Sequence, residues 1–256
     1  MARFRLPKPR LIPAEVAADG DGAVMGFFDH LEELRFRAMR AFLALIVGTL
    51  IGVAVAPRVL KFLVAPYGDL LQTLGPTEGV VSFFRVALLV GGILAIPVIT
   101  YQFLMFILPA LDRKQTRFVL LSIPAVTVLF LVGVIFAWTI LVPPALGFLS
   151  GFQPTIFKPE WTAPLYLGFV TSLLFWMGVA FETPLVLFVL SLMGFLGAGA
   201  LIRNWRIAIV ASSIAAAVIT PTIDPVNMFL VMGPLLSLYV ISIVLVAFGS
   251  RINRNQ

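Results

Sequence analysis

FRVALLVGGILAIPVITYQFLMFIL, residues 84–108, is an apolar run with one charged residue, Arg85, next to its start. A helix needs roughly 20 apolar residues to cross the hydrocarbon core of a bilayer, and this run exceeds that length. The stretch therefore predicts a transmembrane helix. Working outward from it, we find six such runs in the chain, at about 38–56, 84–108, 118–142, 165–193, 207–219 and 226–248.

The overall composition agrees with this prediction. Hydrophobic residues make up 61% of the 256 residues and charged residues 12%, and the mean hydropathy is +1.07. A soluble domain carries about 25% charged residues, so the composition excludes a soluble globular protein. We predict an all-α, polytopic membrane protein with six transmembrane helices. The chain has no cysteine, which excludes a disulfide framework and thiol chemistry.

The basic residues predict that both termini lie in the cytoplasm. With the N-terminus inside, 14 of the 18 Lys and Arg residues fall in inner segments and 4 in outer connections. The positive-inside rule favours this N-in, C-in orientation. Because the basic residues lie at membrane edges, topology explains the net charge of +6, and no nucleic-acid partner is expected.

The chain is predicted to have one membrane domain with a tail at each end. Residues 1–25 are polar and contain proline, and they lack an apolar core of their own, so we expect a disordered cytoplasmic tail and no signal peptide. Residues 26–250 form the six-helix transmembrane domain, and 251–256 form a short cytoplasmic tail.

The fifth apolar run is unusually short. It extends from Ile207 to Ile219, or ~20 Å of helix at ~1.5 Å per residue. The hydrocarbon core is ~30 Å thick, so the bilayer beside this helix should be thinned or wetted. The alternative is that the helix continues outward through Asn204 and Thr222.

Glu182 lies inside the fourth run, in GVAFETPLVL. A carboxylate there costs ~3 kcal/mol on insertion scales, so it should face a cavity, find a partner or be protonated. Thr183 adds a hydroxyl, and Pro184 breaks the helical hydrogen bonding. A functional role and a neutral glutamic acid bonded to a neighbouring helix both remain open. A proton-coupled small-solute permease using Glu182 is the alternative function.

Two further polar residues have simpler interpretations. Asp224 stands before Pro225 in TPTIDP, a pattern typical of an N-cap followed by proline at the first helical position. Capping alone and a further role at this outer turn both stay open. His30 is the only histidine, so no metal site is expected. Neither a phosphate-binding loop nor a catalytic triad is recognisable, and we predict that the chain is not an enzyme.

The stretch FDHLEELRFR, residues 28–37, leads into the first apolar run. Asp29 can cap a helix, and Glu32 then fits the capping-box position. Glu33 has no capping role, and its local partner is Arg37 at i+4. A spare carboxylate at the cytoplasmic membrane surface favours a cationic ligand.

Four stretches, in this order, resemble the TatC family, the polytopic receptor of the twin-arginine protein translocase. They are HLEELRFR at 30–37, IPVITYQFLMFILPAL at 96–111, GVAFETP at 178–184 and TPTIDP at 220–225. The resemblance implies a concave, glove-like wall of six helices, with helices 5 and 6 short, in the plasma membrane of a prokaryote. It implies binding of Arg-Arg signal peptides of folded exported proteins, and transport driven by the proton-motive force without a cofactor. The implied partners are single-span TatA- and TatB-type proteins, further copies of the chain and the lipid bilayer.

The resemblance also assigns roles to individual residues. Glu33 falls on the glutamate of the HLxELR motif that contacts the signal arginines, with Arg35 in the same motif. Glu182 falls on the acid inside the concavity, where Thr183 and Pro184 accompany it, and Asp224 falls on the acid before helix 6. A second signal-binding glutamate is expected shortly after PAL, but Gln115 stands there. Asp112 either compensates for that change or is an ordinary loop acid.

Overall fold

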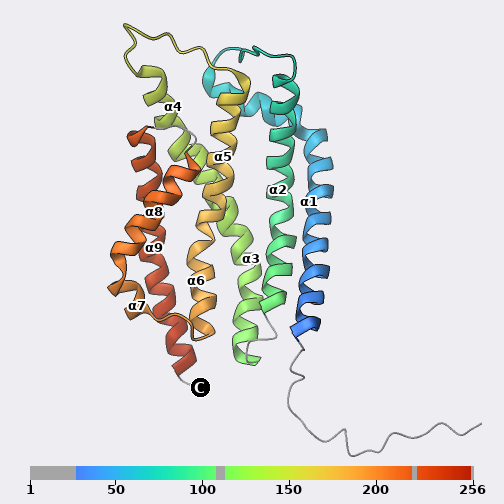
Figure 1. Ribbon diagram of the computed structural model, residues 1–256, viewed down its shortest axis with the longest axis vertical. Coiled ribbons are helices and arrows are strands. Elements are labelled where there is room, and N and C mark those ends of the chain that lie inside the picture. Colours follow the sequence, from blue (N-terminus) through green and yellow to red (C-terminus); the bar gives the residue numbers. More distant parts are fainter. Residues whose placement is uncertain (1–26, 108–112, 221–223, 255–256) are drawn as a thin grey trace, which may run out of the picture.

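The computed structural model describes residues 27–107, 113–220 and 224–254. Within these ranges the chain is helical, with no strand (Figure 1). The elements are α1 Phe27–Val64, η2 Ala65–Tyr67, α2 Glu78–Ile107, α3 Arg113–Phe136, η4 Ala137–Leu141, α4 Val142–Gly151, α5 Ala163–Phe181, α6 Thr183–Leu192, α7 Ala198–Arg203, α8 Trp205–Ile219 and α9 Pro225–Arg254. The prediction of an all-α membrane protein is confirmed.

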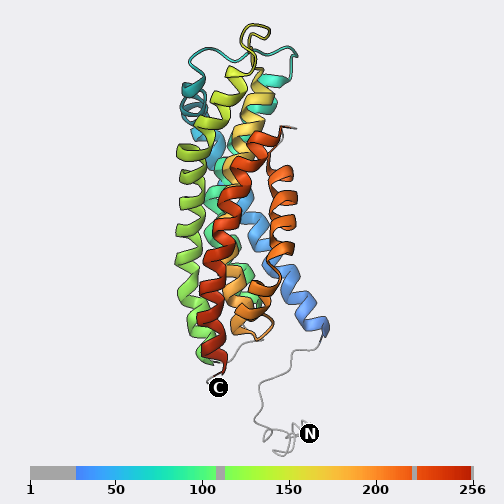
Figure 2. The same ribbon diagram turned by 90° about the vertical axis from the view of Figure 1, so that its left-hand side faces the viewer.

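The helices run up and down between two ends of an elongated bundle (Figures 1 and 2). We call the end that holds the beginning of α1 and the end of α9 the lower end, as drawn in Figure 1, and the opposite one the upper end. Among the described residues, five helical spans are long and apolar enough to cross a membrane, and α8 is a shorter apolar helix. The five spans and α8 correspond to the six predicted runs. Which end faces the cytoplasm stays a prediction.

Two helices extend beyond the predicted runs 38–56 and 118–142, each past a proline. α1 continues through Pro57 to Val64, because Val59, Leu60 and Leu63 beyond the proline still pack against the core. The third run likewise continues past residue 142 through the π-turn η4 into α4. Its two prolines lie in the first turn of α4, where a missing backbone N–H is tolerated.

The two C-terminal runs differ from each other in length. α8 has 15 residues and is bounded by Asn204 and Thr220, which gives ~22 Å of helix. The short fifth helix is therefore confirmed. The prediction of a short sixth helix is wrong, because α9 has 30 residues and accommodates Pro234. Its helix also continues without a break beyond 251, the predicted start of the C-terminal tail, to Arg254.

Helices α1 and α2 approach closely through small residues. A Cβ atom built at Gly48 would lie 2.6 Å from the carbonyl oxygen of Gly91, and one at Gly52 would collide with the carbonyl of Ala87. Gly48 and Gly52 on α1 therefore face Ala87 and Gly91 on α2, an arrangement of small residues four apart that is typical of packed transmembrane helices. Figure 1 shows α1 at one edge of the bundle.

The main core lies where α2, η4, α4 and α5 meet. Its largest fully buried side chains include Leu141, Leu167, Leu173 and Met177. Of the helices, α3 and α2 flank α5, while α6 packs mainly against α9. The wall therefore runs from α1 through α2, α3 and the α5–α6 pair to α9, with α8 packed against α9.

The upper end is closed by a set of residues that we call the aromatic cap, namely Tyr67, Gln72, Trp161 and Tyr166. The Gln72 backbone N–H donates to Trp161 O at 3.2 Å, and the Ala163 N–H donates to Gln72 O at 2.8 Å. The Trp161 ring stacks on Tyr67 and Tyr166, with centroids 5.3 and 5.7 Å apart. The Tyr166 hydroxyl donates to Leu63 O at 2.8 Å. These contacts hold the α1–α2 connection against the start of α5.

Candidate functional site

Glu182 occupies the single residue between α5 and α6. Its backbone stays in the right-handed helical region, with φ −75° and ψ −18°. Its carbonyl accepts hydrogen bonds from the N–H groups of Leu185 and Val186, both at 3.0 Å. The interruption that Pro184 introduces is therefore mild. It places the carboxylate between two helices that together form one span.

The Glu182 side chain lines a cavity of about 380 Å³. The walls come from α1, α2, α3 and the α5–α6 pair, with Leu45 on α1 and Val126 on α3 among them. Apart from Glu182, Thr100 is the one lining residue with a polar side chain among those the structure describes. The cavity expected beside Glu182 is present, but its apolar walls give no support to a pathway for a polar solute.

One oxygen of this carboxyl group has no hydrogen-bond partner among the residues that the structure describes. Oε1 of Glu182 is buried and accepts no hydrogen bond from any residue in the described ranges. An unsatisfied buried polar atom costs free energy, and the cost is larger where lipid replaces water. The cavity therefore offers a hydrogen-bond acceptor to a side chain from outside the chain.

Thr183 and Pro184 do not join Glu182 in this cavity. Thr183 lines a separate cavity of about 410 Å³, whose other walls come from α7, α8 and α9 and include Asn204 and Ser212. Pro184 is buried. Successive helical residues point about 100° apart, so the predicted trio is split between two faces of the α5–α6 span.

At the lower end, Glu33 is paired with Arg37 on the next turn of α1. The Arg37 Nε donates to Oε1 of Glu33 at 2.8 Å, and Nη2 donates to the same oxygen. Glu32 and Arg35 are exposed. Because α1 begins at Phe27, Asp29 lies inside the first turn, and the prediction that it caps the helix is wrong. The predicted i+4 pair of Glu33 and Arg37 is confirmed.

The other predicted lower-end residues are only partly described. Gln115 lies in the first turn of α3, which reaches the same end of the bundle as the start of α1 (Figure 1). Asp112 falls outside the described residues. The structure therefore brings α1 and α3 to one end, and it leaves open whether Asp112 compensates for Gln115.

Asp224 is an N-cap, as its sequence pattern predicts. The Asn227 backbone N–H donates to Oδ1 of Asp224 at 2.7 Å, and the Asn227 side-chain amide donates to Oδ2 at 2.9 Å. Both carboxylate oxygens thus hold the first turn of α9. Asp224 lies at the end opposite to Glu33, so the three predicted acids do not form one site.

Sequence reasoning missed two features of the membrane region. The glycine contact of α1 with α2 has a visible signal, the GxxxG pattern of Gly48 and Gly52 in GTLIG. Arg85 also has a signal, because it is the one charge in the run 84–108. Arg85 is one of the basic residues that predict the orientation, and its side chain also lines a second cavity, which adjoins that of Glu182.

The comparisons with known proteins agree on one family. Residues 29–234 match the family model described as Sec-independent protein translocase protein (TatC). The TatC protein of Koribacter versatilis is 34% identical over 251 residues, with 93% of this chain and 92% of that protein covered. The chloroplastic TATC protein of Oryza sativa is 34% identical over 92% of this chain, which spans 65% of the length of the rice protein.

The fold agrees as well. A crystal structure titled twin arginine translocase receptor TatC superimposes with a TM-score of 0.78 at 37% identity, and it covers 87% of this chain and 100% of the crystallised one. The residues that the family model matches, 29–234, include the positions of Glu33, Gln115 and Glu182. This chain therefore belongs to the TatC family and is a membrane-embedded component of the twin-arginine protein translocase.

Proposed function

We propose that this chain is the receptor subunit of its translocase and binds Arg-Arg signal peptides of folded proteins through Glu33. It sits in the plasma membrane of a prokaryote with its lower end in the cytoplasm, and it uses the proton-motive force. The observation that carries this proposal is the Glu33–Arg37 pair, in which the carboxylate already accepts a guanidinium group.

The chemistry of this pair suits an arginine ligand. The side chains of Glu33 and Arg37 are 16% and 17% exposed, so their attraction is screened less than that of a fully exposed pair. A guanidinium binds a carboxylate through charge-assisted, often bidentate hydrogen bonds, which an ammonium group cannot reproduce. A signal-peptide arginine can therefore take the place of Arg37, and a lysine in the same position should bind more weakly.

The remaining residues of the proposed site are expected to contribute less than Glu33 to recognition of the positively charged ligand. Gln115 offers a neutral carbonyl acceptor, which forms a hydrogen bond with roughly half the strength of one to a carboxylate. Arg35 is exposed on α1, two residues after Glu33. Asp112 stays a candidate for the second carboxylate. We expect Glu33 to provide most of the charge recognition.

Partner assembly is assigned to Glu182. Single-span partners of the TatA and TatB type would place a polar side chain against Oε1, which accepts no hydrogen bond from the described residues. Such interhelical hydrogen bonds contribute ~0.6–2 kcal/mol in membranes. The carboxylate would thus select a partner helix that carries a donor at the right depth.

A peptide pull-down tests the receptor function. Purified chain in detergent is offered immobilised signal peptides that differ only in Arg-Arg or Lys-Lys. We expect retention on the Arg-Arg peptide, loss of most of that retention in Glu33→Gln, and little change in Glu32→Gln, the exposed neighbour. Equal retention on the two peptides by the unaltered chain would contradict the proposal.

A further inference from the structure

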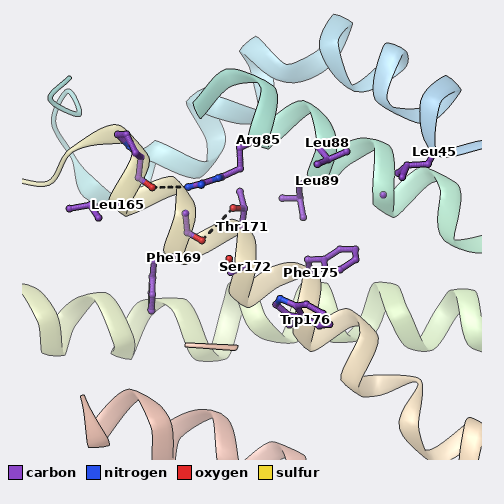
Figure 3. Close-up of a pocket in the computed structure, with 13 residues that line it drawn as sticks. Leu45, Arg85, Leu88, Leu89, Leu165, Phe169, Thr171, Ser172, Phe175 and Trp176 are labelled. Carbon is purple, nitrogen blue, oxygen red and sulfur yellow. Dashed lines mark hydrogen bonds between the residues drawn. The ribbon is translucent and has the colours of Figure 1, made fainter. Parts of the chain in front are cut away.

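A second cavity lies between α2 and α5, nearer the upper end than the Glu182 cavity. It measures about 600 Å³, and Figure 3 shows Arg85 from α2 and Phe169 from α5 among its lining residues. Three residues, Leu45, Gly92 and Phe175, line both this cavity and that of Glu182. The two cavities therefore adjoin each other, and we call the upper one the trough.

Arg85 is the one charged residue in the lining of this upper cavity. Its Nη1 donates to the carbonyl oxygen of Pro164 at 2.9 Å (Figure 3). A Cβ atom built at Gly168 would lie 2.5 Å from Nη1. The guanidinium therefore rests directly on the first turns of α5, in a position that a larger residue at 168 would obstruct.

The guanidinium keeps donors to spare. An arginine has five N–H donors, and the bond to Pro164 is the one hydrogen bond of Arg85 within the described ranges. The side chain is exposed and forms no ion pair with any described residue. A cation in this position is ready to bind an anion from outside the chain.

Apart from Thr171 and Ser172, the other side chains that line the cavity are apolar. Leu88 and Leu89 on α2 and Phe169, Phe175 and Trp176 on α5 all line the cavity, and Figure 3 labels these side chains on the two helices. From Gly168 to Trp176 the α5 helix advances ~12 Å, away from the end that carries the guanidinium. The ligand that complements this trough has an anionic group at one end and a hydrocarbon chain at the other.

We propose that this trough binds an anionic phospholipid, with its phosphate on Arg85 and an acyl chain between α2 and α5. Arg85 lies seven residues after Glu78, the first residue of α2, or ~10 Å along the helix, from where a long arginine side chain reaches the headgroup region. Basic pockets between transmembrane helices are known to bind lipid phosphates. The proposal requires only that the chain spans a membrane and is independent of signal-peptide binding.

Lipid retention during purification tests the proposal. The chain is exchanged into detergent with equal amounts of phosphatidylglycerol and phosphatidylcholine, and bound lipid is counted by native mass spectrometry. We expect phosphatidylglycerol to be preferred about tenfold over phosphatidylcholine, because one charge-assisted contact of ~1.4 kcal/mol changes the binding constant by that factor. Arg85→Gln should abolish the preference, whereas Arg58→Gln, an exposed cation of α1 outside the cavity, should keep it.

Three results would overturn the proposal. The first is equal retention of both lipids by the unaltered chain, and the second is an equal loss of preference in Arg58→Gln and Arg85→Gln. The third concerns a variant with a cysteine in place of Ser172 in the trough. The proposal fails if this cysteine forms a disulfide with a partner's transmembrane helix and the chain shows no preference for the anionic lipid. Should Arg85→Gln fail to fold, the unaltered chain still decides, because an electrostatic preference must weaken with added salt.

Discussion

The aromatic cap and the Glu182 cavity hold comparable polar groups but treat them differently. In the cap, Gln72 bonds through its backbone to Trp161 and Ala163, and its side-chain amide donates to Glu160 at 2.8 Å. In the cavity, Oε1 of Glu182 is buried and accepts no hydrogen bond from the described residues. The described residues thus satisfy the hydrogen bonding of Gln72 in the cap, but not that of Oε1 of Glu182 in the cavity.

This difference indicates two kinds of polar residue in one membrane protein. Groups that the chain satisfies internally stabilise the fold, here by joining the α1–α2 connection to α5. A buried group left unsatisfied is costly in a membrane and is therefore expected to meet a ligand or partner. The same distinction applies to Asp224, which caps α9, and to Arg85, which keeps free donors beside an apolar trough.

The largest expected effect distinguishes the two ends of the bundle, because we propose that the aromatic cap lies outside the cytoplasm. The chain has no cysteine, so single cysteines can be introduced for labelling with an impermeant thiol reagent. Cysteines at Asp69 and Glu160 should be labelled from outside, and those at Gln115 and Arg203 should not. External labelling at 115 would reverse the orientation of the bundle.

A second prediction separates stability from function at the cap. Trp161→Ala removes the ring that stacks on Tyr67 and Tyr166, and we expect it to lower the free energy of unfolding by about 3 kcal/mol. Thermal unfolding in detergent measures the change. Phe157→Ala, in the exposed part of the same loop, is the matched control and should leave Tm unchanged. Equal Tm values for the two variants would show that the aromatic cap does not stabilise the fold.

The opposite behaviour is predicted for Glu182. Glu182→Ala should keep the Tm of the isolated chain, because it deletes an unsatisfied oxygen, but it should weaken partner binding by ~1–2 kcal/mol, or about tenfold. Co-purification with the single-span partner measures the loss. Thr183→Val is the control, since Thr183 faces another cavity. Normal recovery of the partner with Glu182→Ala would show that the carboxyl group does not contribute to partner binding.

The smallest effect is the pH dependence of the exposed rim of the cap. Hydrogen bonds from Lys158 and then Gln72 lower the pKa of Glu160. A carboxyl whose pKa is lower in the folded state stabilises the fold above its ordinary pKa of about 4.3, and this stabilisation is lost as the pH falls through the lowered value. The Tm difference between the unaltered chain and Glu160→Gln should therefore be present at pH 7 and shrink in acid. A difference that does not change with pH would contradict this assignment.

Much of this fold could be predicted from local sequence. The apolar runs predict the membrane spans, and the short distance between the polar residues around 207–219 predicts the short helix α8. The Asp-Pro pair predicts the N-cap of α9. These features depend on residues close together in the chain. The Glu33–Arg37 pair was predictable for the same reason, since i+4 neighbours on a helix meet whatever the tertiary structure.

Features that depend on distant contacts were not predicted. α1 passes Pro57 because residues beyond the proline pack on a core built largely by other helices. The bridge between Gln72 and Thr162 joins two loops that only the assembled bundle brings together. The separation of Glu182 from Thr183 likewise follows from where α2 and α8 pack, which the sequence of α5 and α6 does not contain.

The central claim, that Glu33 recognises a guanidinium group, is tested most directly by a double-mutant cycle. Peptide affinities are measured for the unaltered chain and Glu33→Gln, each with an Arg-Arg and a Lys-Lys signal peptide, and Glu32→Gln is the matched control. We expect Glu33→Gln to cost ~1.5–3 kcal/mol with Arg-Arg and much less with Lys-Lys, so that the coupling energy is large. Equal losses with both peptides, or the same loss in Glu32→Gln, would contradict the claim.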